Sequence, residues 1–347
     1  MDVQTTVREI RLTSFGRREL EGFLAAHGLG LDADTEYALG VYDEEENLVA
    51  CGCAAGRVLK QFAVAETLRG ENILGTVVSG LSAWQYARGN TRLFVYTKPQ
   101  NAILFAQCGF FPVSQTAEVA LLENREHGPE NFAGRFLSPR DAGKRASAIV
   151  MNANPFTLGH RYLVEQAACE SELLYLFVVE EDRSVFPFDV RLRLVEAGTR
   201  DIANVRVLPS GDYIISAASF PAYFIKDKAR VQDAYARLDA RIFCEHIAPL
   251  FGIEKRFVGS EPFCPVTRAY NAILKQECQT HNLVLCELGR RESQGLAISA
   301  SRVRALLAEH GVDSKKLKSM VPETTLAFLE GAGADRVLAG LKKKDTD

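Results

Sequence analysis

A histidine lies where an apolar, strand-like run passes through a short loop into an expected helix. The run ends at Met151, the loop contains Asn152 and Asn154, and Gly159-His160 opens an Ala-rich segment with helical spacing. A helix N-terminus collects unpaired backbone N–H groups and a partial positive charge, which favour a phosphate. Gly159 permits close approach of the backbone, and the imidazole can donate a hydrogen bond to a developing negative charge. A histidine that only caps or packs the helix is the alternative interpretation.

A second group of polar side chains opens a helix near the C-terminus. Ser299 and Ser301 are two residues apart, and Arg304 follows in the expected first turn. Either serine could cap this helix. Capping alone does not account for the guanidinium of Arg304 beside the free backbone N–H groups of the helix start. A guanidinium and free N–H groups together are suited to bind a phosphate. Two such sites in one domain indicate a triphosphate held between them.

The elements that would position these residues alternate between strand and helix. Near-continuous apolar runs predict strands at residues 146–151, 173–179, 205–208, 256–258 and 284–288. Strands of this kind, separated by helices, are typical of a parallel sheet covered on both faces, whose ligands bind beyond the carboxyl ends of the strands. We therefore predict an α/β fold with a doubly wound, Rossmann-like catalytic domain over residues 146–341, and His160 is expected at its strand ends.

The rest of the chain has a different pattern. Residues 1–123 predict an α+β domain, with adjacent strands followed by a helix and a further strand–helix pair. Residues 124–145 are rich in Gly, Pro and charge and lose the apolar periodicity, which predicts a linker. Residues 342–347 form a charged tail.

Composition limits the class of protein. The 347 residues are 47% hydrophobic and 24% charged, as expected for a globular protein of two or three domains. The net charge of -3 argues against nucleic acid as a partner. No apolar signal region or bilayer-length run is present, so no membrane association is expected. The eight cysteines are scattered apart from Cys51 and Cys53, which predicts reduced thiols in a cytoplasmic protein.

Both polar stretches resemble signatures of the nucleotidyltransferase superfamily. Residues 157–160, Thr-Leu-Gly-His, match its T/H-x-G-H signature, and residues 298–304 resemble its late I-S-S-T-x-x-R signature. Asn154-Pro155 replaces the Asp-Pro of many phosphopantetheine adenylyltransferase-like members. Longer strings, from VMNANPFTLGHRYLVEQA through RFVGSEPFCPVTRAYN to AISASRVR, are similar to the citrate (pro-3S)-lyase ligase family, also called citrate lyase synthetases. This resemblance is dense over residues 146–307 and weaker before them.

The resemblance implies a reaction and its participants. ATP with Mg²⁺ is the expected cofactor, and the acetate carboxylate would attack the α-phosphorus to form acetyl-adenylate and pyrophosphate. The acetyl group would then pass to the thiol of a phosphoribosyl-dephospho-CoA arm, with release of AMP. That arm belongs to the acyl carrier subunit of citrate lyase, which the ligase would thereby activate.

The resemblance also implies roles for individual residues. Catalytic roles fall on Thr157, His160 and Arg304. Nucleotide-binding roles fall on Asn152, Asn154, Gly159, Arg191, Lys226, Gly259, Glu261, Ser299 and Ser301. Alternatives remain: Arg191 as a solvated helix charge, Lys226 as a surface residue, and Glu261 as a helix cap. No metal ligand is assigned, because Mg²⁺ usually travels on the triphosphate with few protein ligands.

The N-terminal part resembles an acetyltransferase of the GNAT type. The segments that carry this resemblance are residues 61–75 and the string NAILFAQCGFFPV. Active members bind pyrophosphate with an Arg-x-x-Gly-x-Gly/Ala loop. With Arg69 as its arginine, Asn72 stands where the first glycine belongs and adds bulk beside the phosphates. The expected role is therefore recognition of the CoA-like arm or of the carrier protein.

Two other functions remain open. One is an adenylyltransferase that acts on a small phosphorylated metabolite, either pantetheine phosphate-like or nucleotide-like. Its attack on the α-phosphate would use the same two signatures. The other is an N-acetyltransferase fused to a nucleotide sensor, which the altered loop at Asn72 disfavours.

Overall fold

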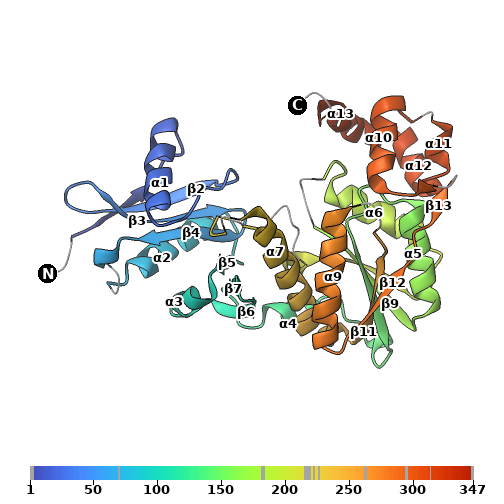
Figure 1. Cartoon of the computed structure of the whole chain (residues 1–347), viewed down its shortest axis with the longest axis horizontal. Coiled ribbons are helices and arrows are strands. Elements are labelled where there is room, and N and C mark those ends of the chain that lie inside the picture. The colour runs from blue at the N-terminus through green and yellow to red at the C-terminus, as the bar shows by residue number, and fades with distance from the viewer. Residues whose placement is uncertain are drawn as a thin grey trace. The chain divides into compact units, whose positions relative to one another are not determined.

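The computed structural model of the chain is shown in Figure 1. It describes residues 4–68, 71–180, 184–214, 220–221, 223–225, 227–261, 264–293, 296–312 and 314–344. The chain forms two compact units. Unit 1 comprises Met1–Gly128 and Pro221–Ala234, and unit 2 comprises Pro129–Phe220 and Tyr235–Asp347. A segment from the middle of the chain therefore completes the N-terminal unit.

Unit 1 is built on a seven-stranded sheet of order β1-β2-β3-β4-β5-β7-β6. Its strands are β1 (Thr6–Glu9), β2 (Tyr37–Tyr42), β3 (Leu48–Ala55), β4 (Val58–Val64), β5 (Phe94–Thr97), β6 (Phe111–Gln115) and β7 (Ala120–Glu123). Neighbouring strands are antiparallel except β4 and β5, which are parallel. Only two residue pairs join β4 to β5, Val58 with Phe94 and Leu59 with Val95. The two strands therefore separate before they end.

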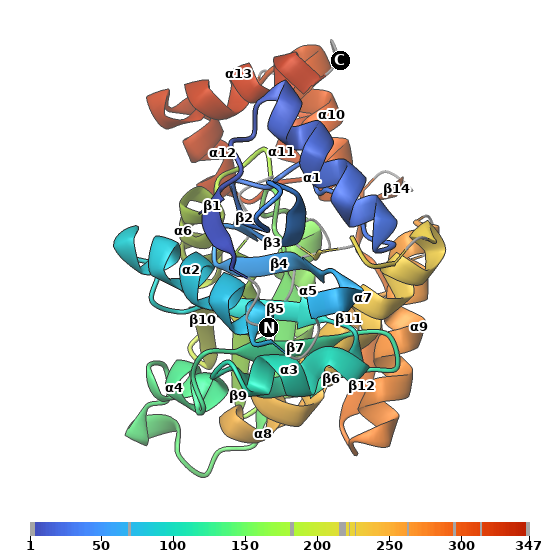
Figure 2. The same ribbon diagram turned by 90° about the vertical axis from the view of Figure 1, so that its left-hand side faces the viewer.

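Helices cover both faces of this sheet. They are α1 (Ser14–Ala26), α2 (Ile73–Ala87) and α3 (Ala102–Ala106). In Figures 1 and 2, α1 and α2 lie on opposite sides of the strands. Val77 and Leu81 of α2 are buried in one apolar cluster, and Leu20 and Leu24 of α1 are buried in another. Because side chains alternate along a strand, one sheet supplies apolar residues to both clusters.

Unit 2 contains a five-stranded, all-parallel sheet of order β10-β9-β8-β11-β12. The strands are β8 (Ala146–Met151), β9 (Leu173–Val178), β10 (Val205–Pro209), β11 (Ile253–Gly259) and β12 (Val284–Leu288). From β8 the chain builds outward to β10 on one side and to β12 on the other. The predicted doubly wound α/β fold is confirmed, and the strand order reverses between β8 and β11. In such sheets the crevice at this reversal is where ligands bind.

Helices pack around the parallel sheet. The bounds are α4 (Gly128–Gly134), α5 (Leu158–Cys169), α6 (Phe188–Thr199), α7 (Lys228–Ile242), α8 (Ala248–Phe251), α9 (Pro265–Thr280), α10 (Ala300–His310), α11 (Lys315–Lys318), α12 (Glu323–Glu330) and α13 (Asp335–Lys344). One of them, α7, begins within the segment that belongs to unit 1. In Figure 1 the strands lie between α9 and α5. Every residue of β9 is buried, as a strand covered on both faces requires. No described helix is long and apolar enough to cross a membrane.

The predicted linker and tail contain helical structure. Residues 124–145 include α4, whose Phe132 is only 1% exposed and packs against Tyr213 and Phe251. Helix α13 continues to Lys344, beyond the residue where the tail is predicted to start. The domain boundaries drawn from the sequence stay predictions. The boundaries were drawn where apolar periodicity is lost, and this criterion does not identify Phe132 as a core residue.

Candidate active site

The loop after β8 carries the first signature to the reversal point of the sheet. Asn152 is exposed, and Ala153 adopts a positive φ of 50°. The Asn154 side-chain oxygen accepts the Phe186 N–H at 3.0 Å. The loop ends at Thr157, which is the N-cap of α5. The hydrogen bond of the Asn154 side chain thus helps to hold the loop in a single conformation between β8 and α5.

Thr157 and His160 form a reciprocal cap at the start of α5. The Thr157 hydroxyl accepts the His160 N–H at 3.3 Å, and His160 Nδ1 accepts the Thr157 N–H at 3.1 Å. Since Nδ1 is an acceptor, the neutral ring carries its proton on Nε2. The Phe156 ring stacks on the imidazole with centroids 5.9 Å apart. The interpretation of His160 as a capping residue is therefore correct. The capping bond uses Nδ1, so Nε2–H remains a donor in a fixed orientation.

The environment keeps this imidazole neutral. Burial of the ring, together with the positive charge of Arg290, lowers the pKa of His160 to about 4 from its ordinary value near 6.5. At pH 7 the ring is thus a neutral hydrogen-bond donor and not an acid. Such a donor suits an oxygen on which negative charge develops.

The two signature stretches meet at Gly159. A Cβ added there would lie 2.9 Å from the Ile298 carbonyl oxygen and 3.4 Å from the Ile298 Cβ. Contacts this short are sterically unfavourable, so only glycine allows the approach. The glycine therefore brings Ser299 and the start of α10 against the start of α5. The structure joins two loops that are far apart in the sequence.

The second stretch caps α10 and also contacts the first loop. The Ser299 hydroxyl accepts the Arg302 N–H at 3.3 Å and lies 3.1 Å from the Ser301 hydroxyl. Arg304 Nη1 donates to the Asn154 carbonyl oxygen at 2.5 Å, and burial lowers the pKa of this guanidinium. Within the described part of the chain, this is the only hydrogen bond of the Arg304 side chain. Its remaining N–H groups are available to a ligand.

Arg191 lies deeper than the sequence suggests. Its side chain is 0% exposed, and it donates to three backbone carbonyls: Phe186 at 2.9 Å, Asn152 at 2.8 Å and Val179 at 2.7 Å. The alternative of a solvated helix charge is wrong, because the guanidinium is buried. Bonds to carbonyls after β8 and β9 indicate that Arg191 holds the Asn152 loop. A direct contact with nucleotide stays a prediction.

The end of β11 forms the opposite wall of the crevice. Gly259 is its last residue, and the Gly259 carbonyl accepts the Asn271 amide at 3.2 Å. One Glu261 carboxylate oxygen accepts the Cys264 N–H at 3.1 Å at the start of α9, and the other pairs with Arg290. The N-cap of α9 is Cys264, so Glu261 binds the residue that precedes the helix and is not itself the cap. Lys226 lies outside the described residues.

Sequence reasoning missed Arg290. This residue follows β12 by two positions and carries the charge that acts on His160. A basic residue just past a predicted parallel strand was the available signal, because strand ends gather at one edge of the sheet.

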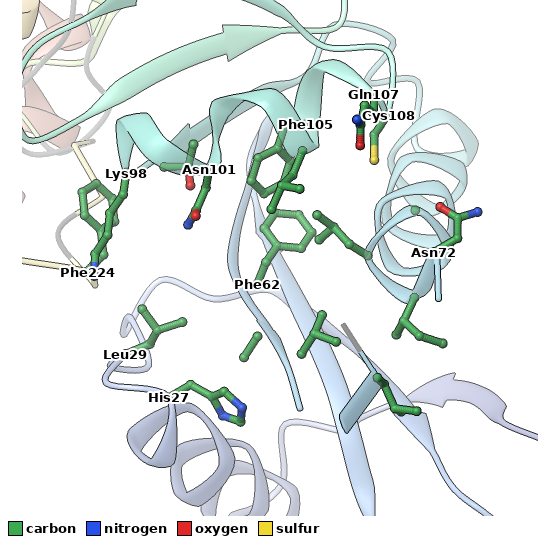
Figure 3. Close-up of a pocket in the computed structure, with 18 of the residues that line it drawn as sticks. His27, Leu29, Phe62, Asn72, Lys98, Asn101, Phe105, Gln107, Cys108 and Phe224 are labelled. Carbon is green, nitrogen blue, oxygen red and sulfur yellow. The ribbon is translucent and has the colours of Figure 1, made fainter. Parts of the chain in front are cut away.

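Unit 1 contains a cavity of about 690 Å³ where β4 and β5 separate (Figure 3). Its lining includes Phe62 of β4, Asn72 before α2, Lys98 after β5, and Phe224 from the inserted segment. The neighbouring Tyr223 hydroxyl donates to the Tyr96 carbonyl at 2.8 Å, which anchors that segment. The inserted segment thus forms part of the cavity wall.

Asn72 covers the start of α2. It is the N-cap with a left-handed φ of 55° and no side-chain capping bond. Its side-chain oxygen is so close to Gly75 that an added Cβ would clash with it. The carboxamide therefore lies over the first helical turn. Arg69, the arginine expected in this loop, lies outside the described residues.

Comparisons with known proteins agree on one family. The family model described as the citrate lyase ligase C-terminal domain matches residues 146–329. A citrate (pro-3S)-lyase ligase of Klebsiella pneumoniae is 41% identical over 318 residues, covering 90% of this chain and 92% of the relative. The Escherichia coli ligase is also 41% identical over 318 residues, with 90% of each chain covered. The Haemophilus influenzae ligase is 39% identical over 320 residues, covering 90% and 95%.

Two solved structures resemble about a third of the chain. Escherichia coli ElaA has a TM-score of 0.30 and 15% identity, covering 35% of this chain and 99% of its own. A GNAT-family acetyltransferase of Staphylococcus aureus has a TM-score of 0.30 and 10% identity, covering 35% and 99%. Scores this low do not assign an activity. The sequence relatives and the family model do identify the protein, and this chain belongs to the citrate lyase ligase family of enzymes.

Proposed function

We propose that this ligase activates citrate lyase by acetylating the thiol of a phosphoribosyl-dephospho-CoA arm on the acyl carrier subunit. ATP and acetate are consumed through acetyl-adenylate, and AMP and pyrophosphate are released. The observation that carries the proposal is the meeting of α5 and α10 at Gly159, beside His160 and Arg304. Two helix N-termini and a guanidinium at one place suit a polyphosphate.

This geometry suits the first step of the proposed reaction. An acetate oxygen bonds to the α-phosphorus while the bond from that phosphorus to the bridging oxygen breaks, and pyrophosphate leaves with the electron pair. Neutral His160 would donate its Nε2–H to an α-phosphate oxygen. Arg304, with the Ser299 and Ser301 hydroxyls, would stabilise the departing pyrophosphate.

In the second step, the thiolate sulfur of the arm bonds to the acetyl carbonyl carbon and AMP leaves. The thiol proton passes to solvent. No residue of this chain needs to carry the acetyl group. The step requires only that the arm reaches the adenylate in the crevice.

Mg²⁺ would accompany the triphosphate. Among the described residues, no group of three His, Cys, Asp or Glu side chains is placed to hold a metal ion. Mg²⁺ that accompanies a nucleotide is usually held by phosphate oxygens and water, with only one or two carboxylates from the protein. The charge it supplies would add to that of Arg304.

Isotope exchange tests the chemistry. With wild-type protein and Mg²⁺, acetate should drive labelled pyrophosphate into ATP without any carrier protein. Release of ADP and orthophosphate would contradict adenylation and indicate acetyl-phosphate chemistry. Exchange that needs a phosphorylated metabolite in place of acetate would favour the alternative, an adenylyltransferase acting on that metabolite.

We also propose that the cavity of unit 1 serves recognition of the carrier-bound arm or of the carrier protein. Its support is the open region between β4 and β5 and the mixed polar and apolar lining. The Asn72 carboxamide over α2 argues against use of free acetyl-CoA, whose diphosphate would need the covered N–H groups.

A further inference from the structure

Arg290 is held by hydrogen bonds on one side, and its other side has no partner among the described residues. Its Nε donates to the Ser260 carbonyl at 2.7 Å, and its Nη2 pairs with Glu261. The Arg290 side chain is 27% exposed, whereas that of Glu261 is 7% exposed. The carboxylate is therefore almost buried, while part of the guanidinium reaches solvent.

The free side of Arg290 consists of hydrogen-bond donors. A guanidinium has five N–H groups, and the two bonds to Ser260 and Glu261 use Nε–H and one N–H of Nη2. Nη1 has no acceptor anywhere in the described part of the chain. A cationic fork with open donors is well suited to bind phosphate in bidentate fashion.

The position of Arg290 places these donors at the crevice. Ser260 N–H donates to the Leu288 carbonyl at 2.8 Å, which joins the carboxyl ends of β11 and β12. Strand β11 lies next to β8, whose loop leads to His160, and β12 lies on the other side of β11. The charge of Arg290 is near enough to His160 to contribute to its lowered pKa. The guanidinium thus lies near the strand ends and within electrostatic reach of His160 at the start of α5.

We infer that Arg290 binds the triphosphate of ATP, and that Glu261 is a positioning residue that holds the guanidinium toward it. This inference rests on the proposed function, because it places ATP in the crevice of unit 2. It gives Glu261 an indirect role: one carboxylate oxygen accepts the N–H of Cys264, the N-cap residue of α9, and the other orients Arg290.

Binding measurements with two probes test the inference. The probes are the Mg²⁺ complex of α,β-methylene-ATP, in which the bond to be cleaved is blocked, and adenosine, which lacks phosphate. In full-length Arg290→Ala, calorimetry should show analogue binding about tenfold weaker or more, with adenosine binding unchanged. Arg290→Lys should recover only part of the loss, since an ammonium cannot reproduce the fork. Arg291→Ala is the matched control and should bind both probes as wild type does.

A double-mutant cycle tests the positioning role. Glu261→Gln keeps an acceptor for the Cys264 N–H but removes the charge partner of Arg290. It should weaken analogue binding severalfold without affecting adenosine, and it should add nothing to Arg290→Ala. A merely structural carboxylate would weaken both probes alike and add to the arginine change.

The outcomes separate this inference from the proposed function. Analogue binding by Arg290→Ala at wild-type strength would overturn the inference even if acetate drives exchange. A wild-type protein that binds the analogue through Arg290 but shows no acetate-dependent exchange would overturn acetate activation and leave the inference standing. Failure of the wild type to bind the analogue would overturn both.

Discussion

At position 160, one imidazole makes a helix cap and presents a donor. Nδ1 accepts the Thr157 N–H, and this fixes the tautomer whose Nε2–H is free to meet a phosphate oxygen. Helix capping and catalysis are therefore not rival interpretations of His160. The capping bond orients the ring, and the lowered pKa of about 4 keeps it neutral.

A substitution at this residue can separate the two roles. Glutamine at the third helical position is a usual partner in a reciprocal cap, so His160→Gln should preserve α5 and the thermal stability. The rate of acetate-dependent exchange should nevertheless fall on the order of a hundredfold, because the ring donor is lost. Exchange kinetics and a melting curve measure the two effects. A folded His160→Gln protein with a normal rate would leave His160 as a cap only.

Two helices, α5 and α10, depend on one close approach between backbones. Gly159 faces the Ile298 carbonyl, so the N-terminus of α10 is positioned by the absence of a side chain on α5. Because the neighbour is backbone, it cannot yield by changing rotamer. One of the two helices must therefore move if a larger residue replaces Gly159.

Gly159→Ala should therefore impair the site more than it impairs the fold. We expect a loss of about 1–3 kcal/mol in the free energy of unfolding, and a larger fractional loss in ATP binding as α10 shifts. Gly340→Ala is the control, because α13 has open space around that glycine. Alanine there should stabilise the protein by about 0.5–1 kcal/mol. Urea unfolding and nucleotide titration of both variants provide the comparison, and unchanged nucleotide binding in Gly159→Ala would count against the packing argument.

Over the whole molecule, the two units carry different parts of the proposed reaction. The adenylation groups all belong to unit 2, whereas the cavity beside α2 belongs to unit 1. The inserted segment Pro221–Ala234 completes unit 1 through Tyr223, whose backbone carbonyl also accepts the Gly30 N–H at 3.1 Å. Truncation at residue 123 would therefore deprive this segment of the sheet on which it packs. Point substitutions are the sharper way to separate the units.

Asn72→Gly changes unit 1 alone. The left-handed φ of 55° suits glycine, so the variant should fold at least as stably as the wild type. Removal of the carboxamide should uncover the first turn of α2 and strengthen binding of acetyl-CoA, which the wild type should bind weakly. Calorimetry with acetyl-CoA measures this, while pyrophosphate exchange should stay unchanged. Tight acetyl-CoA binding by the wild type would contradict the proposed role of Asn72.

Much of unit 2 was predictable because its signals are local. The strand predicted at residues 146–151 matches β8, and the run at 284–288 matches β12. Thr157 and Ser299 are caps whose residue types and positions mark a helix start directly in the sequence. The loops that carry the candidate site could therefore be placed at strand and helix ends before any contact between them was known.

The sequence by itself determined the order of strands and helices, the two capped helix starts and the family resemblance, since apolar periodicity and capping act over a few residues. Only the tertiary structure decided the burial of Arg191, the pairing of Glu261 with Arg290, and the insertion of Pro221–Ala234 into unit 1. Each of these depends on groups brought together from distant parts of the chain. The sequence does not indicate whether carbonyl oxygens, a carboxylate or water will surround a charged side chain. Tertiary packing determines which of these groups becomes its partner.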